Sequence, residues 1–115
     1  MVGNNYPLET EEQQTVVQFL ELKRLKFSAI PNSTYTKSWK QKTKNKLDGL
    51  RAGLPDLLVV TKKHLLFIEM KRKKGGIVSN VQKEWITALN GINDDVVAQV
   101  CCGADEAIDF INKYV

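Results

Sequence analysis

The chain has 115 residues, enough for one domain with a modest hydrophobic core and too few for two. Hydrophobic residues make up 43% and charged residues 26%, which excludes a disordered chain, and no apolar run approaches the roughly 18 residues that span a membrane. The first residues also lack the charged and then apolar pattern of a secretory signal.

The positive charge is concentrated in two windows. The formal net charge is +4. Residues 37–51 hold six of the seventeen Lys and Arg residues and residues 62–74 hold six more, with a single acid in each window. Such local fields favour a polyanionic partner such as a nucleic acid.

The first helix is expected over residues 10–26. Thr10 is suitable as its N-cap, and Val16 and Leu20 form an apolar stripe with helical spacing. Residues 1–8 before it are expected to form a loose lead-in.

Two neighbouring acids lie in the first turn of this helix. Glu12 extends the buried stripe, and Glu11 is its competitor. An acid in a first turn commonly does no more than interact with the helix dipole, so that interpretation stays open beside a functional one.

A short strand is predicted over residues 27–30, followed by a basic loop over residues 32–50. Tyr35 and Trp39 lie among the lysines of the loop. Long loops in compact domains are often functional, and aromatic rings among cations suit nucleic acid. A plain solvated loop is the alternative.

Residues 57–60 and 65–68 are two apolar runs separated by a polar tetrapeptide, which predicts a β-hairpin. If Lys62 and Lys63 form the turn, the positions of each pair add up to 125, and Asp56 lies opposite Glu69. Lys71, two residues further on, shares the face of Glu69. The open end of the hairpin therefore gathers two carboxylates and one ammonium.

Such a group has a specific chemical use. Two close carboxylates repel each other unless a cation lies between them, and Mg²⁺ prefers hard oxygen ligands of this kind. Lys71 beside the ion could stabilise negative charge on a phosphate. The plain alternative is a solvated strand end.

The C-terminal part is predicted to form a helix, a strand and a helix. Ser79 is the N-cap of a helix that ends near Gly91, residues 96–101 form a buried strand, and residues 105–114 form the last helix. Both hairpin faces are apolar, so helices must cover both. The expected fold is one α/β domain with a small mixed β-sheet flanked by helices on both faces.

The ordered set of motifs resembles the VRR-NUC (virus-type replication-repair nuclease) domain, a branch of the PD-(D/E)XK nuclease superfamily. The likeness extends from about residue 11 to residue 114. Its residues are Glu12, the run Gly53 to Asp56, the run Ile68 to Lys71, Gly76 with Ser79, the run Gln82 to Trp85, and the run Ala104 to Ile108.

The resemblance implies a restriction-endonuclease-like αβββαβ core and a Mg²⁺- or Mn²⁺-dependent endonuclease. It implies that Asp56, Glu69 and Glu12 are metal or supporting carboxylates, that the Met70 carbonyl is a further ligand, that Lys71 is the catalytic lysine, and that Gln82 is the helix glutamine. The residues expected to contact DNA are Lys37, Lys40, Lys42, Lys44, Lys46, Arg51, Arg72, Lys73 and Lys74.

Stand-alone domains of this size are similar to phage and bacterial proteins that form homodimers and act on branched DNA, including four-way (Holliday) junctions. A cytoplasmic protein with reduced Cys101 and Cys102 is expected, without an organic cofactor or a membrane partner. Two alternatives remain: a non-catalytic nucleic-acid-binding module with a nuclease fold, and a structural subunit of a larger assembly.

Overall fold

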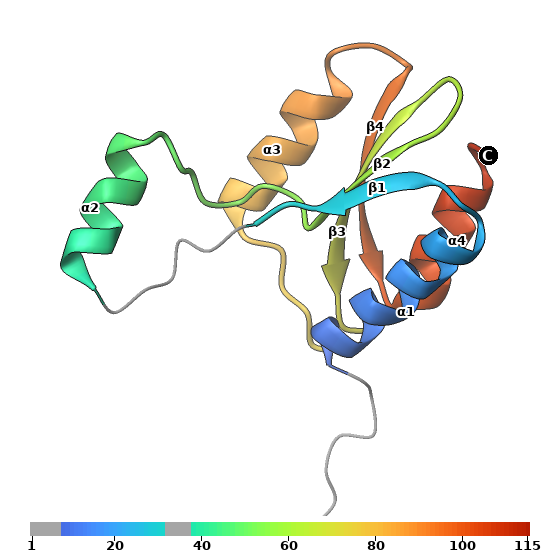
Figure 1. The fold of residues 1–115 in the computed structure, drawn as a ribbon, viewed down its shortest axis with the longest axis horizontal. Coiled ribbons are helices and arrows are strands. Elements are labelled where there is room, and N and C mark those ends of the chain that lie inside the picture. The colour runs from blue at the N-terminus through green and yellow to red at the C-terminus, as the bar shows by residue number, and fades with distance from the viewer. Residues whose placement is uncertain (1–7, 32–37) are drawn as a thin grey trace, which may run out of the picture.

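The computed structural model describes residues 8–31 and 38–115 (Figure 1). Residues 1–7 of the expected lead-in, and Tyr35 and Lys37, lie outside the described residues. The elements are α1 (Glu9–Leu22), β1 (Lys26–Ala29), α2 (Trp39–Leu47), β2 (Leu57–Val60), β3 (Leu65–Lys71), α3 (Asn80–Asn90), β4 (Val96–Cys102) and α4 (Ala104–Asn112).

The four strands form one mixed sheet in the order β1-β2-β3-β4. β1 pairs with β2 and β2 with β3 in antiparallel fashion, whereas β3 and β4 are parallel. Parallel neighbours need a crossover connection, which α3 supplies. The predicted small mixed α/β fold is therefore confirmed.

The hairpin register is the predicted one. Leu57 lies opposite Ile68 and Val60 opposite Leu65, so the paired positions add up to 125 at both ends of the ladder. The tetrapeptide 61–64 forms the turn, with Lys62 and Lys63 at its tip. This register fixes which side chains of β3 share a face.

One face of the sheet packs against α1 and α4, which lie together on one side (Figure 1). Alternate residues of β2 and β3 point to this side and have no exposed surface. The core consists of Leu57, Val59, Leu66, Ile68 and Met70 from the hairpin, Cys101 from β4, and Val16, Leu20, Ala104, Ala107, Phe110 and Ile111 from the two helices.

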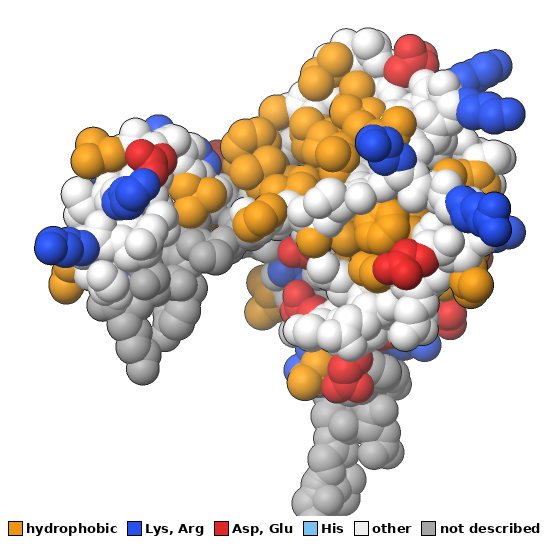
Figure 2. All heavy atoms as spheres, in the orientation of Figure 1, with side chains coloured by type: hydrophobic (Ala, Val, Ile, Leu, Met, Phe, Trp, Pro, Cys, Tyr) orange, Lys and Arg blue, Asp and Glu red, His pale blue; other side chains and the backbone are white. Residues whose placement is uncertain are grey.

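Among the described helices, α3 is the one that covers the opposite face. No residue of this described helix is buried, and Val60 on the same face is 40% exposed. Figure 2 shows hydrophobic side chains gathered on the surface around α3 and the adjoining strands. The predicted helix on the second face is present, but it leaves apolar side chains of this face exposed.

The outer edge of β4 is closed by side chains. Asn90 donates from Nδ2 to the Ala98 carbonyl over 2.9 Å and accepts from the Ala98 N–H over 2.8 Å. Glu106 accepts a hydrogen bond from the Cys102 N–H. These bonds occupy backbone groups that an unprotected edge strand would offer to another chain.

The first helix differs from the prediction at both ends. Its N-cap is Leu8, not Thr10, because the Leu8 carbonyl already accepts the Glu12 N–H over 3.0 Å. It ends at Leu22, four residues earlier than predicted, because Arg24 adopts φ +56° and interrupts the helical backbone.

The predicted loop over residues 32–50 contains α2, so the loop prediction is wrong for that part. Ser38 caps the helix by accepting the Gln41 N–H at Oγ over 3.2 Å. Lys and Gln are good helix formers, which explains a helix without a core-facing stripe. Among the described helices, none is long and apolar enough to cross a bilayer.

Candidate active site

Asp56 is fixed to β3 by two hydrogen bonds. Its N–H donates to the Ile68 carbonyl over 2.9 Å, and its Oδ2 accepts the Met70 N–H over 2.7 Å. The carboxyl group therefore lies beside Glu69, as the register predicts. The Met70 side chain itself is buried in the core on the other face.

Glu69 and Lys71 lie on the α3 face at the end of β3. Lys71 Nζ is 3.7 Å from Glu69 Oε2, and the two residues are only 7% and 2% exposed. Lys and Glu are rarely buried unless they are paired. The predicted meeting of Asp56, Glu69 and Lys71 is thus present in the structure.

Gln82 brings the N-terminus of α3 to this group. Its Nε2 donates to Glu69 Oε2 over 3.1 Å, while its Oε1 accepts the Ser79 N–H over 2.9 Å. Ser79 Oγ accepts the Gln82 N–H in return, which completes a capping box. One amide side chain therefore caps α3 and orients Glu69.

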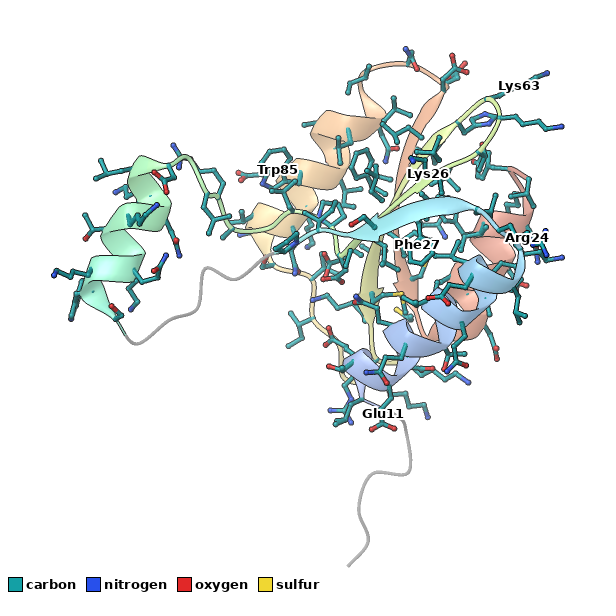
Figure 3. All side chains as sticks on the ribbon, in the orientation of Figure 1. Glu11, Arg24, Lys26, Phe27, Lys63 and Trp85 are labelled. Carbon is teal, nitrogen blue, oxygen red and sulfur yellow. The ribbon has the colours of Figure 1, made fainter. Side chains whose placement is uncertain are left out.

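The segment before Asp56 is held against α3. Gly53 has φ +96°, and a Cβ atom there would lie 2.5 Å from Val81 Cγ1. Trp85 Nε1 donates to the Ala52 carbonyl over 3.0 Å, and Figure 3 shows Trp85 on α3. Only glycine allows this approach without strain. Helix α3 therefore positions Glu69 through Gln82 and also positions the segment that leads to Asp56.

The two carboxyl groups are more basic than ordinary ones. Burial raises the pKa of Asp56, against the lowering effect of the Met70 N–H and of Lys71. Burial, and then the charge of Asp56, raise the pKa of Glu69 to about 8, although Lys71 opposes the change. Close, buried carboxylates disfavour each other's ionised form unless a cation is added.

The donor atoms fit a divalent cation. Glu69 Oε1 is buried and has no hydrogen-bond partner in the described structure. Within residues 8–31 and 38–115, no three His, Cys, Asp or Glu residues are placed to hold a metal together. The chain would thus supply two carboxylates, and water, backbone carbonyls or phosphate the rest, as is common for Mg²⁺.

Glu12 contacts the start of α4. It is 6% exposed, and its Oε1 accepts the Ala104 N–H over 3.2 Å at the start of α4. Its Oε2 lies beside Gly103. A buried carboxylate at a helix N-terminus is stabilised by the helix dipole. The structure therefore brings Oε1 of Glu12 to the N-terminus of α4, while Oε2 is buried without a hydrogen-bond partner among the described residues.

Sequence reasoning did not consider the acid one turn earlier in α1. Glu9 and Gln13 line a pocket of about 310 Å³ together with Asp56. The negative charge of Glu9 is also one of the smaller causes of the raised Glu69 pKa. Glu11, by contrast, is exposed on α1 (Figure 3). No local signal singled out Glu9, because Glu9, Glu11 and Glu12 all lie in the first turn of α1.

The basic residues expected to contact DNA fall into two groups. One group lies along α2 and ends with Arg51 just beyond it. Arg51 Nη1 donates to the Lys46 carbonyl and, over 3.1 Å, to the Leu50 carbonyl. Lys37 belongs to this stretch but lies outside the described residues. The members of the group on the helix are Lys40, Lys42, Lys44 and Lys46.

The second group comes directly after β3 in the sequence, and its members have different surroundings. Arg72 is half-buried with its Nε unpaired among described atoms, while Lys73 Nζ is 3.7 Å from Asp105 Oδ2 at α4. Lys74 is exposed. The three residues therefore differ in their exposure and in their partners.

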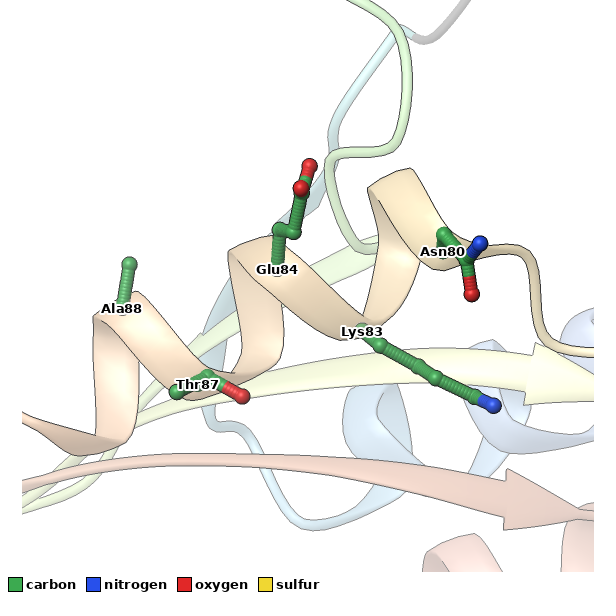
Figure 4. A pocket seen from close by; sticks show the side chains of 5 residues that line it. All are labelled: Asn80, Lys83, Glu84, Thr87 and Ala88. Atoms are coloured by element: carbon green, nitrogen blue, oxygen red, sulfur yellow. The ribbon is translucent and has the colours of Figure 1, made fainter.

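A separate shallow pocket lies on the outer face of α3 (Figure 4). Its side chains come from one stripe of the helix and point away from the face that carries Gln82. Four of its five lining residues are polar or charged, and neither Asp56 nor Glu69 is among them. The lining residues are Asn80, Lys83, Glu84, Thr87 and Ala88.

Comparisons with known proteins agree on one family. The family model of the VRR-NUC domain matches residues 3–105. A solved structure described as a VRR_NUC domain protein superposes with a TM-score of 0.70 and 30% identity, covering 100% of this chain and 91% of that one. Another, described as a VRR_NUC domain, has a TM-score of 0.64 and 18% identity over 93% and 97%. No curated protein matches the chain at comparable significance.

Proposed function

The chain belongs to the VRR-NUC family, whose nuclease fold processes DNA, and from this we propose a Mg²⁺- or Mn²⁺-dependent endonuclease that hydrolyses DNA phosphodiester bonds. The observation that carries the proposal is the buried group of Asp56, Glu69 and Lys71, in which Glu69 Oε1 lacks a partner among the described residues.

Asp56 and Glu69 would hold the divalent ion, with the Met70 carbonyl as a further ligand. When bound, the ion would lower the pKa of a coordinated water and neutralise charge on the phosphate. The protein's own contribution is a fixed geometry: the Met70 N–H holds Asp56, and Gln82 holds Glu69. Such orienting bonds keep ligands in place before substrate arrives.

Lys71 would act on the reacting phosphate. Its ammonium is almost excluded from solvent and lies 3.7 Å from Glu69 Oε2. A buried cation stabilises the negative charge that develops on the attacking water and on the phosphate more strongly than an exposed one. Lys71 is the catalytic lysine of this proposal.

We assign the acid of α1 differently from the sequence-based expectation. Glu9 shares a pocket with Asp56, whereas Glu12 accepts a hydrogen bond from α4. Glu9 is therefore the better placed supporting carboxylate, and Glu12 serves the packing of α1 against α4.

Branched DNA, including four-way junctions, is the proposed substrate, and a homodimer would present two sites for two strands. The uncovered apolar surface around α3 and Val60 supports a second copy there, since Asn90 and Glu106 obstruct pairing through the β4 edge. Light scattering tests this: Val60→Asp should yield monomers, Lys62→Asp should not, and a monomeric wild-type protein at micromolar concentration would refute the dimer.

The nuclease proposal is tested by incubating the purified protein with branched and linear DNA in Mg²⁺, Mn²⁺ or EDTA. Cleavage with metal, absent in EDTA and abolished in Asp56→Asn and Lys71→Ala, supports it. Salt-sensitive binding without cleavage under any metal condition would favour the alternative, a non-catalytic nucleic-acid-binding module.

A further inference from the structure

Helix α2 exposes a tryptophan that the fold does not use. Trp39 and Leu47 are 79% and 81% exposed, and no residue of this described helix is buried. Trp39, Thr43 and Leu47 are spaced four residues apart, so they lie on one stripe. In Figures 1 and 2 the helix stands apart from the sheet and its covering helices.

Nothing in the domain core explains this stripe. A nine-residue helix is marginal in water without tertiary packing, and the structure has α2 packing none of its residues into the core. An exposed indole ring therefore contributes little to folding. A large aromatic side chain in such a position is typical of a contact with a partner.

The charges around the stripe indicate what the partner is. On the helix, Lys40 and Lys44 lie on one side of the apolar stripe, and Lys42 and Lys46 lie on the other. The acid that follows, Asp48, is already paired, 2.6 Å from Lys44 Nζ. Cations on both sides of an apolar strip match a chain whose phosphates flank flat bases.

Lys42 also acts on the ring itself. Its Nζ lies 5.1 Å from the centroid of the Trp39 ring, a cation–π arrangement. This contact covers one side of the indole, so the other side is the one available to a base. If the partner of α2 were a second copy of the protein, that copy would need acids that pair with these lysines. The outer stripe of its α3 carries Lys83 as well as Glu84, so this stripe is not a purely acidic surface.

We infer that α2 is a DNA-binding arm in which Trp39 stacks on an unpaired or terminal base while its lysines contact the phosphates on either side. The inference rests on the proposed nuclease function, because it takes DNA as the substrate. The arm is the element that selects DNA in which a base is unstacked, and Trp39 is the residue that sets this preference.

The test measures binding in EDTA, so that no cleavage is needed. The probes are a duplex closed by hairpins at both ends and the same duplex with a short unpaired tail. Trp39→Ala should weaken binding of the tailed DNA by about 5- to 100-fold, the range of one base-stacking contact, and change binding of the closed duplex less than about twofold. Trp39→Phe should retain most of the preference.

Leu47→Ala is the matched control, since it removes an equally exposed apolar side chain from the same stripe. It should leave the preference unchanged. Tailed DNA should also quench the fluorescence of the wild-type protein more than that of Trp39→Phe, in which Trp85 is the remaining tryptophan. Equal losses for both DNAs, no loss, or equal effects of Leu47→Ala and Trp39→Ala would overturn the inference.

The lysines have a control of equal charge. The double variant Lys40→Ala with Lys46→Ala should make the slope of log affinity against log salt less steep by about two, since each lost phosphate contact accounts for about one. Lys62→Ala with Lys63→Ala, at the hairpin tip away from α2 (Figure 3, where Lys63 is labelled), should leave it unchanged. Equal slopes for the two variants would overturn the role of the arm.

The two proposals fail in different ways. If only the arm is wrong, Trp39→Ala leaves the preference for tailed DNA unchanged, and the wild-type protein still cleaves DNA with metal. A protein that never cleaves DNA but still binds tailed DNA through Trp39 refutes the nuclease and retains the arm.

Discussion

The amide of Gln82 reaches the carboxylate of Glu69 across 3.1 Å, from the first turn of α3 to the end of β3. The same side chain accepts the Ser79 N–H, so the helix cap and the orientation of the acid depend on one residue. Because Gln82 has both roles and Ser79 has only the capping role, substitutions at the two residues should have different effects.

Gln82→Ala should reduce both stability and activity. Loss of the cap costs about 1 kcal/mol of the free energy of unfolding, and loss of an orienting partner lowers activity by about 10- to 100-fold. Ser79→Ala removes the cap without touching Glu69, so it should lower stability similarly and leave the cleavage rate nearly unchanged. Urea denaturation and single-turnover cleavage distinguish them, and equal rates for the two variants would contradict the role of Gln82.

Gly53→Ala should destabilise the fold more than Gly49→Ala. Both glycines have positive φ, +96° and +92°, so both substitutions strain the backbone by roughly 1–2 kcal/mol. Only at Gly53 does the new Cβ collide with α3, whereas Gly49 has open space. Gly53→Ala should also slow cleavage, because it displaces the segment that leads to Asp56. Thermal unfolding of the two variants measures the difference, and equal losses would show that α3 does not constrain this segment.

Glu9→Gln should affect cleavage, whereas Glu12→Gln should affect stability. Glu12→Gln weakens the contact of the carboxylate with the α4 N-terminus, so it lowers stability by roughly 0.5–1 kcal/mol and leaves cleavage largely intact. Glu9→Gln should preserve stability and weaken metal-dependent cleavage, measured as the Mg²⁺ concentration that gives half-maximal rate. The reverse pattern would restore Glu12 as the functional acid.

The raised pKa of Glu69 predicts a pH-dependent stability of the metal-free protein. In the fold this pKa is about 8, and its ordinary value is 4.5, so folding favours the protonated carboxyl group. Its stabilising contribution is complete below pH 4.5 and is lost as the pH rises through 8. In EDTA the wild type should therefore lose more stability between pH 6 and pH 9 than Glu69→Gln does.

Mg²⁺ should reverse this trend, because it binds the ionised form. Its affinity should increase with pH up to about 8, and titration calorimetry in two buffers should show proton release on binding. Parallel pH profiles for the wild type and Glu69→Gln would mean that Glu69 is not the group responsible.

The hairpin was predictable because its polar tetrapeptide defined the turn, and the turn then placed Asp56 beside Glu69. The supporting carboxylate from α1 was not predictable, because the choice among Glu9, Glu11 and Glu12 depends on how the helix lies against the sheet. That placement follows from long-range packing against α4, which no local pattern specifies.

Helix α2 was missed for a different reason. Its lysines hide the spacing of Trp39, Thr43 and Leu47, and no core-facing stripe marks it as a helix. The signal present was local: Ser38 as a cap, followed by residues with high helix propensity. Periodicity detects helices that pack on a core, and α2 does not.

The most direct test of the central claim is a crystal structure of the protein with Mn²⁺, with anomalous scattering to locate the ion. The account predicts one peak bound by carboxylate oxygens of both Asp56 and Glu69 at roughly 2.0–2.3 Å, with Lys71 adjacent, and its loss in Asp56→Asn. A peak at Glu12 alone, or none between Asp56 and Glu69 at saturating Mn²⁺, would contradict it.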